Sequence, residues 1–160
     1  MILPDLPDSS RVWVYTANRE LMPAEQSLVL NEMSVFTKEW KAHGAALSAG
    51  AAILHNRYLI LAADESAALA SGCSIDASVR MLKTIGGEIG VDFFARTLVT
   101  YREADQAFVT VPMHEFWALR KAHRINDHTE VFNATAKALG ELRTKGWQTF
   151  AESWHAEMWR

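Results

Sequence analysis

The order of strand-like and helix-like segments constrains the fold of this chain more than any single motif does. Residues 11–16 are β-branched and aromatic, which favours a strand. Pro23 suits the first turn of a helix, and apolar residues then recur at helical spacing up to His43-Gly44. Glycine there favours a left-handed C-cap. The chain therefore begins with a strand followed by a helix.

A hairpin and a second helix are predicted next. Two apolar runs, 51–54 and 58–61, flank His55-Asn56-Arg57, where asparagine tolerates the positive φ of a tight turn. The helix is expected to start at Ser74 or Asp76 as its N-cap, with an apolar face made of Ile75, Val79, Leu82, Ile89 and Phe93. Gly86-Gly87 in its middle predicts either a break or a close approach to another segment.

A second hairpin completes the core pattern. Residues 98–101 and 108–111 are strand-like, and Pro112 ends the outgoing strand. The order strand, helix, strand, strand, helix, strand matches a split βαβ arrangement. We therefore expect an α+β fold, a ferredoxin-like antiparallel sheet with both helices on one face.

From Met113 onward the periodicity turns helical, interrupted by capping residues at 126–129. We expect a single domain over 1–160, with a lead-in at 1–10, a sandwich core at 11–112 and a helical C-terminal extension at 113–160. A chain of this length, with 49% hydrophobic and 22% charged residues, has enough apolar material for one core.

Charge and cysteine content limit the classes of partner and the cellular location that we expect. The formal net charge is only −3, from 16 basic and 19 acidic side chains, so we expect no nucleic-acid partner. A single cysteine fits a reducing, cytoplasmic location, and no leader or membrane-spanning segment is visible, so we expect no membrane partner. Trp147, Trp154 and Trp159 crowd the last fourteen residues and indicate either a partner surface or docking of this segment onto the rest of the domain. We expect self-association through the sheet or this tail, and no cofactor.

One turn offers chemistry, the run Ser71-Gly72-Cys73-Ser74-Ile75-Asp76 directly before the second helix. A helix start presents unpaired N–H groups and the positive end of the helix dipole. With their hydroxyls and close backbone, Ser71, Gly72, Ser74 and Asp76 define a candidate ligand-binding turn. Our main hypothesis is a non-enzymatic domain that binds a small anionic ligand or a protein partner here. The alternative is an ordinary cap with Cys73 as a small core residue.

Two further hypotheses use the same region. In a thiol-dependent enzyme, Cys73 is the nucleophile and His55 or His114 the base, because a reactive thiol needs an oriented histidine. In a carboxylate metal-binding protein, a divalent cation is held by convergent acids among Asp64, Glu65, Asp76 and Asp92. Exposed strand ends and helix caps are the far commoner role of such acids.

Three stretches carry a resemblance: 63–66, the run 71–80, and Gly90-Val91-Asp92-Phe93-Phe94-Ala95-Arg96, together with Trp13-Val14-Tyr15 and Trp40 with His43-Gly44. Over residues 11–103 the chain resembles a family of short uncharacterised bacterial proteins, found mostly in Bacteroidetes, some of which are called ABC-transporter ATPases. The chain has no Walker A lysine loop and no LSGGQ-like signature. The resemblance therefore implies no ATPase activity, but it singles out the same turn at 71–76.

Overall fold

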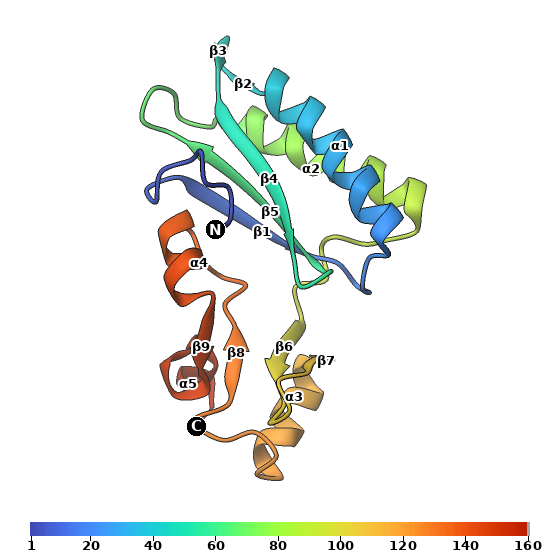
Figure 1. The fold of residues 1–160 in the computed structure, drawn as a ribbon, viewed down its shortest axis with the longest axis vertical. Helices are drawn as coiled ribbons and strands as arrows, with labels where there is room; N and C mark the ends of the chain where they lie inside the picture. The colour runs from blue at the N-terminus through green and yellow to red at the C-terminus, as the bar shows by residue number, and fades with distance from the viewer. Residues whose placement is uncertain (160) are drawn as a thin grey trace.

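Two antiparallel sheets form the frame of the protein (Figure 1). The computed structural model describes residues 1–159. The first sheet has the strand order β1-β5-β4 and the second has the order β7-β6-β8-β9. The strands are β1 (Arg11–Thr16), β4 (Ser48–Leu54), β5 (Tyr58–Asp64), β6 (Leu98–Arg102), β7 (Phe108–Pro112), β8 (Glu130–Phe132) and β9 (Trp147–Thr149), with a separate two-residue pair of β2 (Lys41–Ala42) and β3 (Ala45–Ala46).

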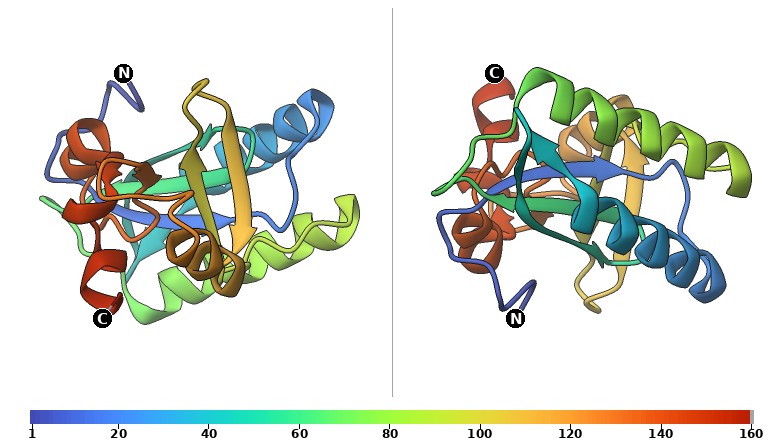
Figure 2. Two further views of the ribbon diagram at one scale, coloured as in Figure 1. Left: turned by 90° about the horizontal axis from the view of Figure 1, so that it is seen from below. Right: turned by 90° about the horizontal axis from the view of Figure 1, so that it is seen from above.

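The five α-helices of residues 1–159 confirm the mixed α+β class. They are α1 (Pro23–Glu39), α2 (Gly72–Ile89), α3 (Met113–Lys121), α4 (Leu139–Lys145) and α5 (Trp154–Met158), with a 3-10 turn η1 at Phe150–Glu152. Helices α1 and α2 lie together on one face of the first sheet (Figures 1 and 2). Their core includes Val29, Met33, Leu82 and Ile85, all fully buried.

The first three strands of the expected split βαβ arrangement are present. Strand β5 pairs antiparallel with both β1 and β4, so β1 and β4 run parallel with β5 between them. The fourth expected strand, β6, is not in this sheet, because it pairs with β7 and β8 instead. After α2 the chain returns to the edge of β1, where Phe94 forms a single bridge with Thr16. The chain runs parallel to β1 at this bridge, whereas the fourth strand of a split βαβ sheet would have to run antiparallel to it.

The helical extension predicted at 113–160 is only partly helical: α3, α4 and α5 lie within it, but so do two strands that were not predicted. Strands β8 and β9 lie within it and pair with each other, and β8 joins β6 at Val131. Hairpin β6–β7 therefore belongs with the C-terminal region rather than with the predicted core. The reason is burial, since Val131 and Phe132 are almost fully covered in this arrangement.

The second face of the first sheet is covered by the N-terminal lead-in and α4. Leu6, Val12 and Leu139 share one cluster there. Arg143 of α4 holds the lead-in in place, because its guanidinium donates hydrogen bonds of 2.6–3.1 Å to the carbonyls of residues 2, 3 and 6 and pairs with Asp8.

Two predicted helix ends were misplaced. Helix α1 ends at Glu39 rather than at His43-Gly44, and those two residues form the turn between β2 and β3 with φ of 50° and 81°. Glycine takes the left-handed conformation as expected, but in a hairpin. Helix α2 begins at Gly72 with Ser71 as its N-cap, and neither Ser74 nor Asp76 holds that position.

The glycine pair in α2 marks a close approach, not a break. The helix continues through Gly86 and Gly87 to Gly90, whose φ of 70° ends it. A Cβ on Gly86 would lie 2.3 Å from the carbonyl oxygen of Val91, whereas nothing lies within 4 Å of a Cβ on Gly87. Only Gly86 is required by packing.

We therefore expect opposite effects from two neighbouring substitutions. Gly86→Ala should lower the free energy of unfolding by about 1–3 kcal/mol, because the backbone of Val91 has to move. Gly87→Ala should raise it by about 0.5–1 kcal/mol, since alanine restricts the unfolded chain at no steric cost. Urea unfolding of both variants measures the difference, and equal effects would contradict this account of the pair.

Candidate functional site

The predicted turn at the start of α2 is built as a helix cap. Ser71 Oγ accepts a hydrogen bond from the backbone N–H of Ser74 at 3.1 Å, and Ser74 Oγ accepts one from the N–H of Ser71 at 3.0 Å. The hydroxyl of Ser74 also contacts the carbonyl of Lys41 at 3.0 Å. Both hydroxyls thus serve the cap. Within residues 1–159, the N–H groups of Gly72 and Cys73 have no hydrogen-bond acceptor.

Cys73 is exposed, so it is not the core residue of the alternative interpretation. It lies in an open hollow of about 520 Å³, shared with Trp40, Lys41 and His43 from the segment after α1. His43 is a histidine that sequence reasoning missed. Residues 43 and 73 line one hollow only because β2 packs against the start of α2, and no local pattern indicates that proximity.

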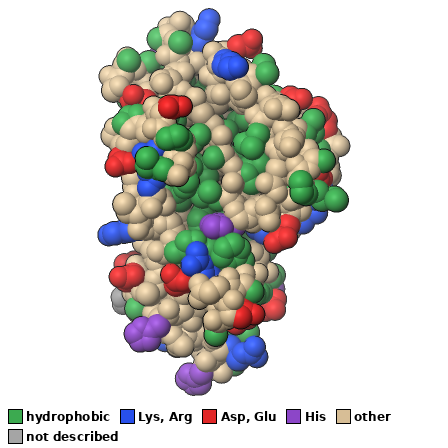
Figure 3. All heavy atoms as spheres, viewed as in Figure 1, with side chains coloured by type: hydrophobic (Ala, Val, Ile, Leu, Met, Phe, Trp, Pro, Cys, Tyr) green, Lys and Arg blue, Asp and Glu red, His purple; other side chains and the backbone are tan. Residues whose placement is uncertain are grey.

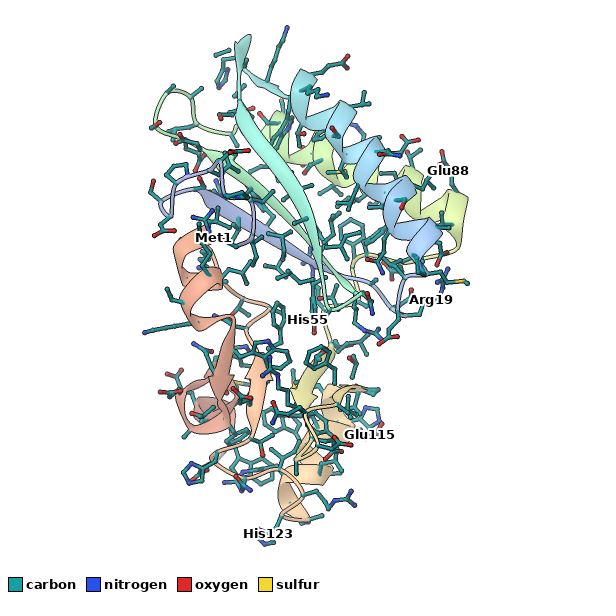
Figure 4. All side chains as sticks on the ribbon, in the orientation of Figure 1. Met1, Arg19, His55, Glu88, Glu115 and His123 are labelled. Carbon is teal, nitrogen blue, oxygen red and sulfur yellow. The ribbon has the colours of Figure 1, made fainter. Side chains whose placement is uncertain are left out.

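The two histidines predicted as bases for Cys73 do not line its hollow. His55 forms the tip of the β4–β5 hairpin, as Figure 4 shows. Helix α2 begins beyond the opposite end of β5, a seven-residue strand that spans roughly 20 Å. His114 is exposed in the first turn of α3. The structure therefore does not assemble the thiol and these imidazoles into one centre.

His55 instead joins the two sheets. Its ring packs edge-on against Phe108, Phe132 and Trp147 of the second sheet at centroid distances of 4.7–5.2 Å. Burial, assisted by the nearby charge of Arg102, lowers the pKa of the imidazole. Figure 3 shows the hydrophobic side chains gathered around a histidine where the two halves meet. This arrangement is structural packing.

The predicted carboxylates also do not form a cation site. Asp64 and Asp92 each accept a hydrogen bond from a backbone N–H two residues later, and Glu65 accepts one from Ala70. Asp76 is exposed on α2. Among residues 1–159, no group of three or more histidine, cysteine, aspartate or glutamate side chains gathers as metal ligands. The geometry gives the carboxylate hypothesis no support.

A cavity of about 370 Å³ lies between the two sheets and is a stronger candidate. Its walls come from β1, β5, α2, β6 and α5, and they are mostly apolar. The volume falls in the lower part of the range typical of small-molecule sites. The lining side chains include Trp13, Ile75, Val79, Phe93, Val99, Met113, Phe132 and Trp154.

The outer edge of β1 opens into this cavity at Val14. Val12 N–H donates to the carbonyl of Lys137 at 3.0 Å, and the carbonyl of Thr16 accepts from Ala95 N–H at 3.1 Å. Because backbone groups alternate sides along a strand, Val14 faces the same outer edge. Neither its N–H nor its carbonyl has a partner within residues 1–159. The cavity therefore contains one unpaired peptide donor and one unpaired peptide acceptor.

A neutral imidazole lines the same cavity. His155 is 4% exposed, and burial lowers its pKa to about 4. The hydroxyl of Ser153 donates to the carbonyl of Phe150 at 2.8 Å and therefore offers a lone pair to Nδ1 of His155 at 3.2 Å. The ring proton then sits on Nδ1. Nε2 is left as an acceptor, without a partner in residues 1–159 but not sealed from solvent.

Arg96 supplies a positive charge at the cavity wall. None of the ion pairs in residues 1–159 involves its guanidinium. Burial raises the pKa of the nearby Tyr15 phenol, and the charge of Arg96 partly offsets that rise. Tyr58 is less available, because its hydroxyl donates to Thr100 at 2.6 Å. Val14, Arg96 and His155 were not predicted as site residues, since each is significant only through contacts between distant segments.

Comparison with protein-family models, with curated proteins and with solved structures finds no match, so function has to be inferred from this geometry. In the described part of the chain, no helix combines the length and the apolar character needed to cross a membrane.

The buried imidazole predicts a specific pH dependence of stability. The folded-state pKa of His155, about 4, lies below the ordinary value of 6.5, so the unfolded chain binds this proton first as the pH falls. The contribution of His155 to the free energy of unfolding is complete above pH 6.5 and declines toward pH 4. As the pH falls from 7 to 4.5, the free energy of unfolding of His155→Phe should therefore decrease less than that of the original protein.

Urea unfolding at a series of pH values measures this difference. Above pH 7 the two proteins should differ by a constant offset, which reports the change in packing alone. Parallel curves over the whole range would contradict a buried neutral imidazole.

Proposed function

We propose that the protein binds a small, mostly apolar carboxylate that carries an amide, in the cavity between its two sheets. The unpaired backbone of Val14 is the observation that carries the proposal. Burying an unpaired peptide N–H and carbonyl is unfavourable. A ligand satisfies both groups at once when it presents an N–H and a carbonyl or carboxylate oxygen on the same side, as one residue of a neighbouring strand does. An acylated amino acid has this arrangement in its amide N–H and its carboxylate. The proposal keeps a small anionic ligand as the bound molecule but moves its site from the turn at 71–76 to the cavity.

Three other features support this ligand class. The apolar walls favour an aliphatic or aromatic side group. Arg96 favours a carboxylate, with which a guanidinium makes two parallel hydrogen bonds. Nε2 of His155 favours a hydrogen-bond donor on the ligand. Cys73, the exposed thiol, lies in a different hollow, which favours binding over thiol catalysis at this cavity.

Matched small molecules test each part of the proposal. N-acetylphenylalanine has an amide, a carboxylate and an aromatic ring, whereas 3-phenylpropionate lacks the amide and N-acetylphenylalanine amide lacks the carboxylate. We expect calorimetry to give about tenfold weaker binding for each of the two incomplete probes, since one charged or buried hydrogen bond is lost. Binding should also raise the melting temperature.

Variants identify the groups involved. Arg96→Gln should remove the preference for the acid over the amide, while Arg80→Gln, on the exposed side of α2, is the control and should leave it unchanged. Ala134→Trp should fill the cavity and abolish binding of all three probes. Equal binding of the complete and incomplete probes, or retained binding in Ala134→Trp, would overturn the proposal.

The start of α2 is a second candidate, for an inorganic or organic phosphate. Cys73, whose backbone N–H is free, lines the hollow together with the cationic side chain of Lys41 and the imidazole of His43, while Glu39 adds one carboxylate to the same lining. The cap itself uses the serine hydroxyls, so the backbone and these two side chains would provide the contacts.

We expect phosphate to slow the alkylation of Cys73 by iodoacetamide, a neutral reagent, because the anion covers the thiol. Sodium chloride at equal ionic strength is the control, and Lys41→Gln should weaken the protection. The rate is followed by mass spectrometry. Identical rates in phosphate and chloride would remove this second candidate.

A further inference from the structure

The free edge of β4 is the longest open strand edge of the protein. Strand β4 has seven residues and lies at the end of the first sheet, paired only with β5. The opposite edge of that sheet, β1, is bridged near both its ends, by Phe94 and by Ala138. The edges of the second sheet are shorter, since β9 has three residues and β7 has five, the last of them proline.

The register identifies which backbone groups face outward. The backbone N–H and carbonyl groups of even-numbered β1 residues point away from β5, as the hydrogen bonds of Val12 and Thr16 show. The odd-numbered residues of β1 therefore bond to their odd-numbered partners in β5. It follows that the backbone groups of even-numbered β5 residues point toward β4. The β4 partners of those even residues are 48, 50, 52 and 54. Ala49, Ala51 and Ile53 therefore direct their N–H and carbonyl groups to the open edge, where none has a partner within residues 1–159.

The sequence of strand β4 itself has none of the residue types that usually protect an edge. Its sequence, Ser-Ala-Gly-Ala-Ala-Ile-Leu, contains no charged residue and no proline. Beside it runs a shallow groove of about 320 Å³ between α1 and residues 49–51. Its other lining residues are Leu3 of the lead-in and Leu30, Ser34, Thr37 and Lys38 of α1. A strand placed along β4 would find both hydrogen-bonding groups and adjacent apolar surface.

We propose that this edge pairs with the same edge of a second copy of the chain, joining the two three-stranded sheets into one of six strands. The outward groups are self-complementary about Ala51: in an antiparallel pair centred there, Ala51 faces Ala51 of the second copy, and Ala49 faces Ile53. All of the outward donors and acceptors of residues 49, 51 and 53 are then satisfied. A two-fold axis closes such a pair, so assembly stops at the dimer. The net charge of −3 per chain opposes the approach of two copies only weakly.

Sedimentation velocity over a range of protein concentrations tests the proposal. We expect a species of twice the chain mass of 17.9 kDa. Ala52→Lys should shift the protein to the monomer, because it places a charge from each copy next to the joined edge while the backbone of residue 52 still pairs with β5. Val35→Lys is the matched control: it adds the same charge to α1, at a side chain that is 60% exposed, and should leave the dimer intact.

Hydrogen exchange gives a second, direct measurement on the unsubstituted chain. The amides of Ala49, Ala51 and Ile53 should become protected as the protein concentration rises, whereas that of Ala52, bonded within the sheet, should be protected at every concentration. Circular dichroism verifies that Ala52→Lys is folded. A monomer at all concentrations, or a dimer that Val35→Lys disrupts and Ala52→Lys does not, would overturn the proposal. So would protection of these three amides that does not depend on concentration.

Discussion

The pairing of the outer edge of β1 determines how the rest of the molecule is arranged. A buried strand edge has to find partners for its N–H and carbonyl groups. In this chain the partners come from two distant segments: the C-terminal region bonds to Val12, and the segment after α2 bonds to Thr16. Each segment covers only one end of the strand. The second sheet is anchored to the first at both places, and the uncovered middle at Val14 becomes part of the cavity wall.

The cavity is formed in advance because further contacts fix the two sheets relative to each other. The hydroxyl of Tyr58, in the first sheet, bonds to Thr100 in the second, and its ring packs on Phe132 with centroids 4.2 Å apart. His55 adds its aromatic contacts at the hairpin tip. A ligand therefore does not have to bring the halves together, and its binding energy is not reduced by that ordering cost.

Local patterns predicted local structure well. The strand at 11–16 and the turn at 55–57 were correct, because each depends on residue preferences within a few positions. The end of α1 and the membership of β6 were not predicted correctly. A glycine such as Gly44 fits a helix cap and a hairpin equally well, and which sheet a strand joins depends on residues as distant as Val131. The candidate cavity was invisible for the same reason, since its polar groups come from separate segments.

The contrast between Cys73 and His155 shows why a local search for chemistry finds one kind of residue and misses another. Cys73 attracts attention because a thiol beside a helix start is reactive in principle, yet the residues around it mainly complete a cap. His155 lies in an unremarkable stretch of sequence, but the fold removes it from water, leaves one ring nitrogen as an acceptor and places it in the same cavity as Arg96 and Val14. The half-buried backbone of Val14 and Nε2 of His155 have no partner within residues 1–159, and exposed Arg96 takes part in none of the ion pairs there. A molecule that binds all three groups is the simplest occupant of the apolar space between them.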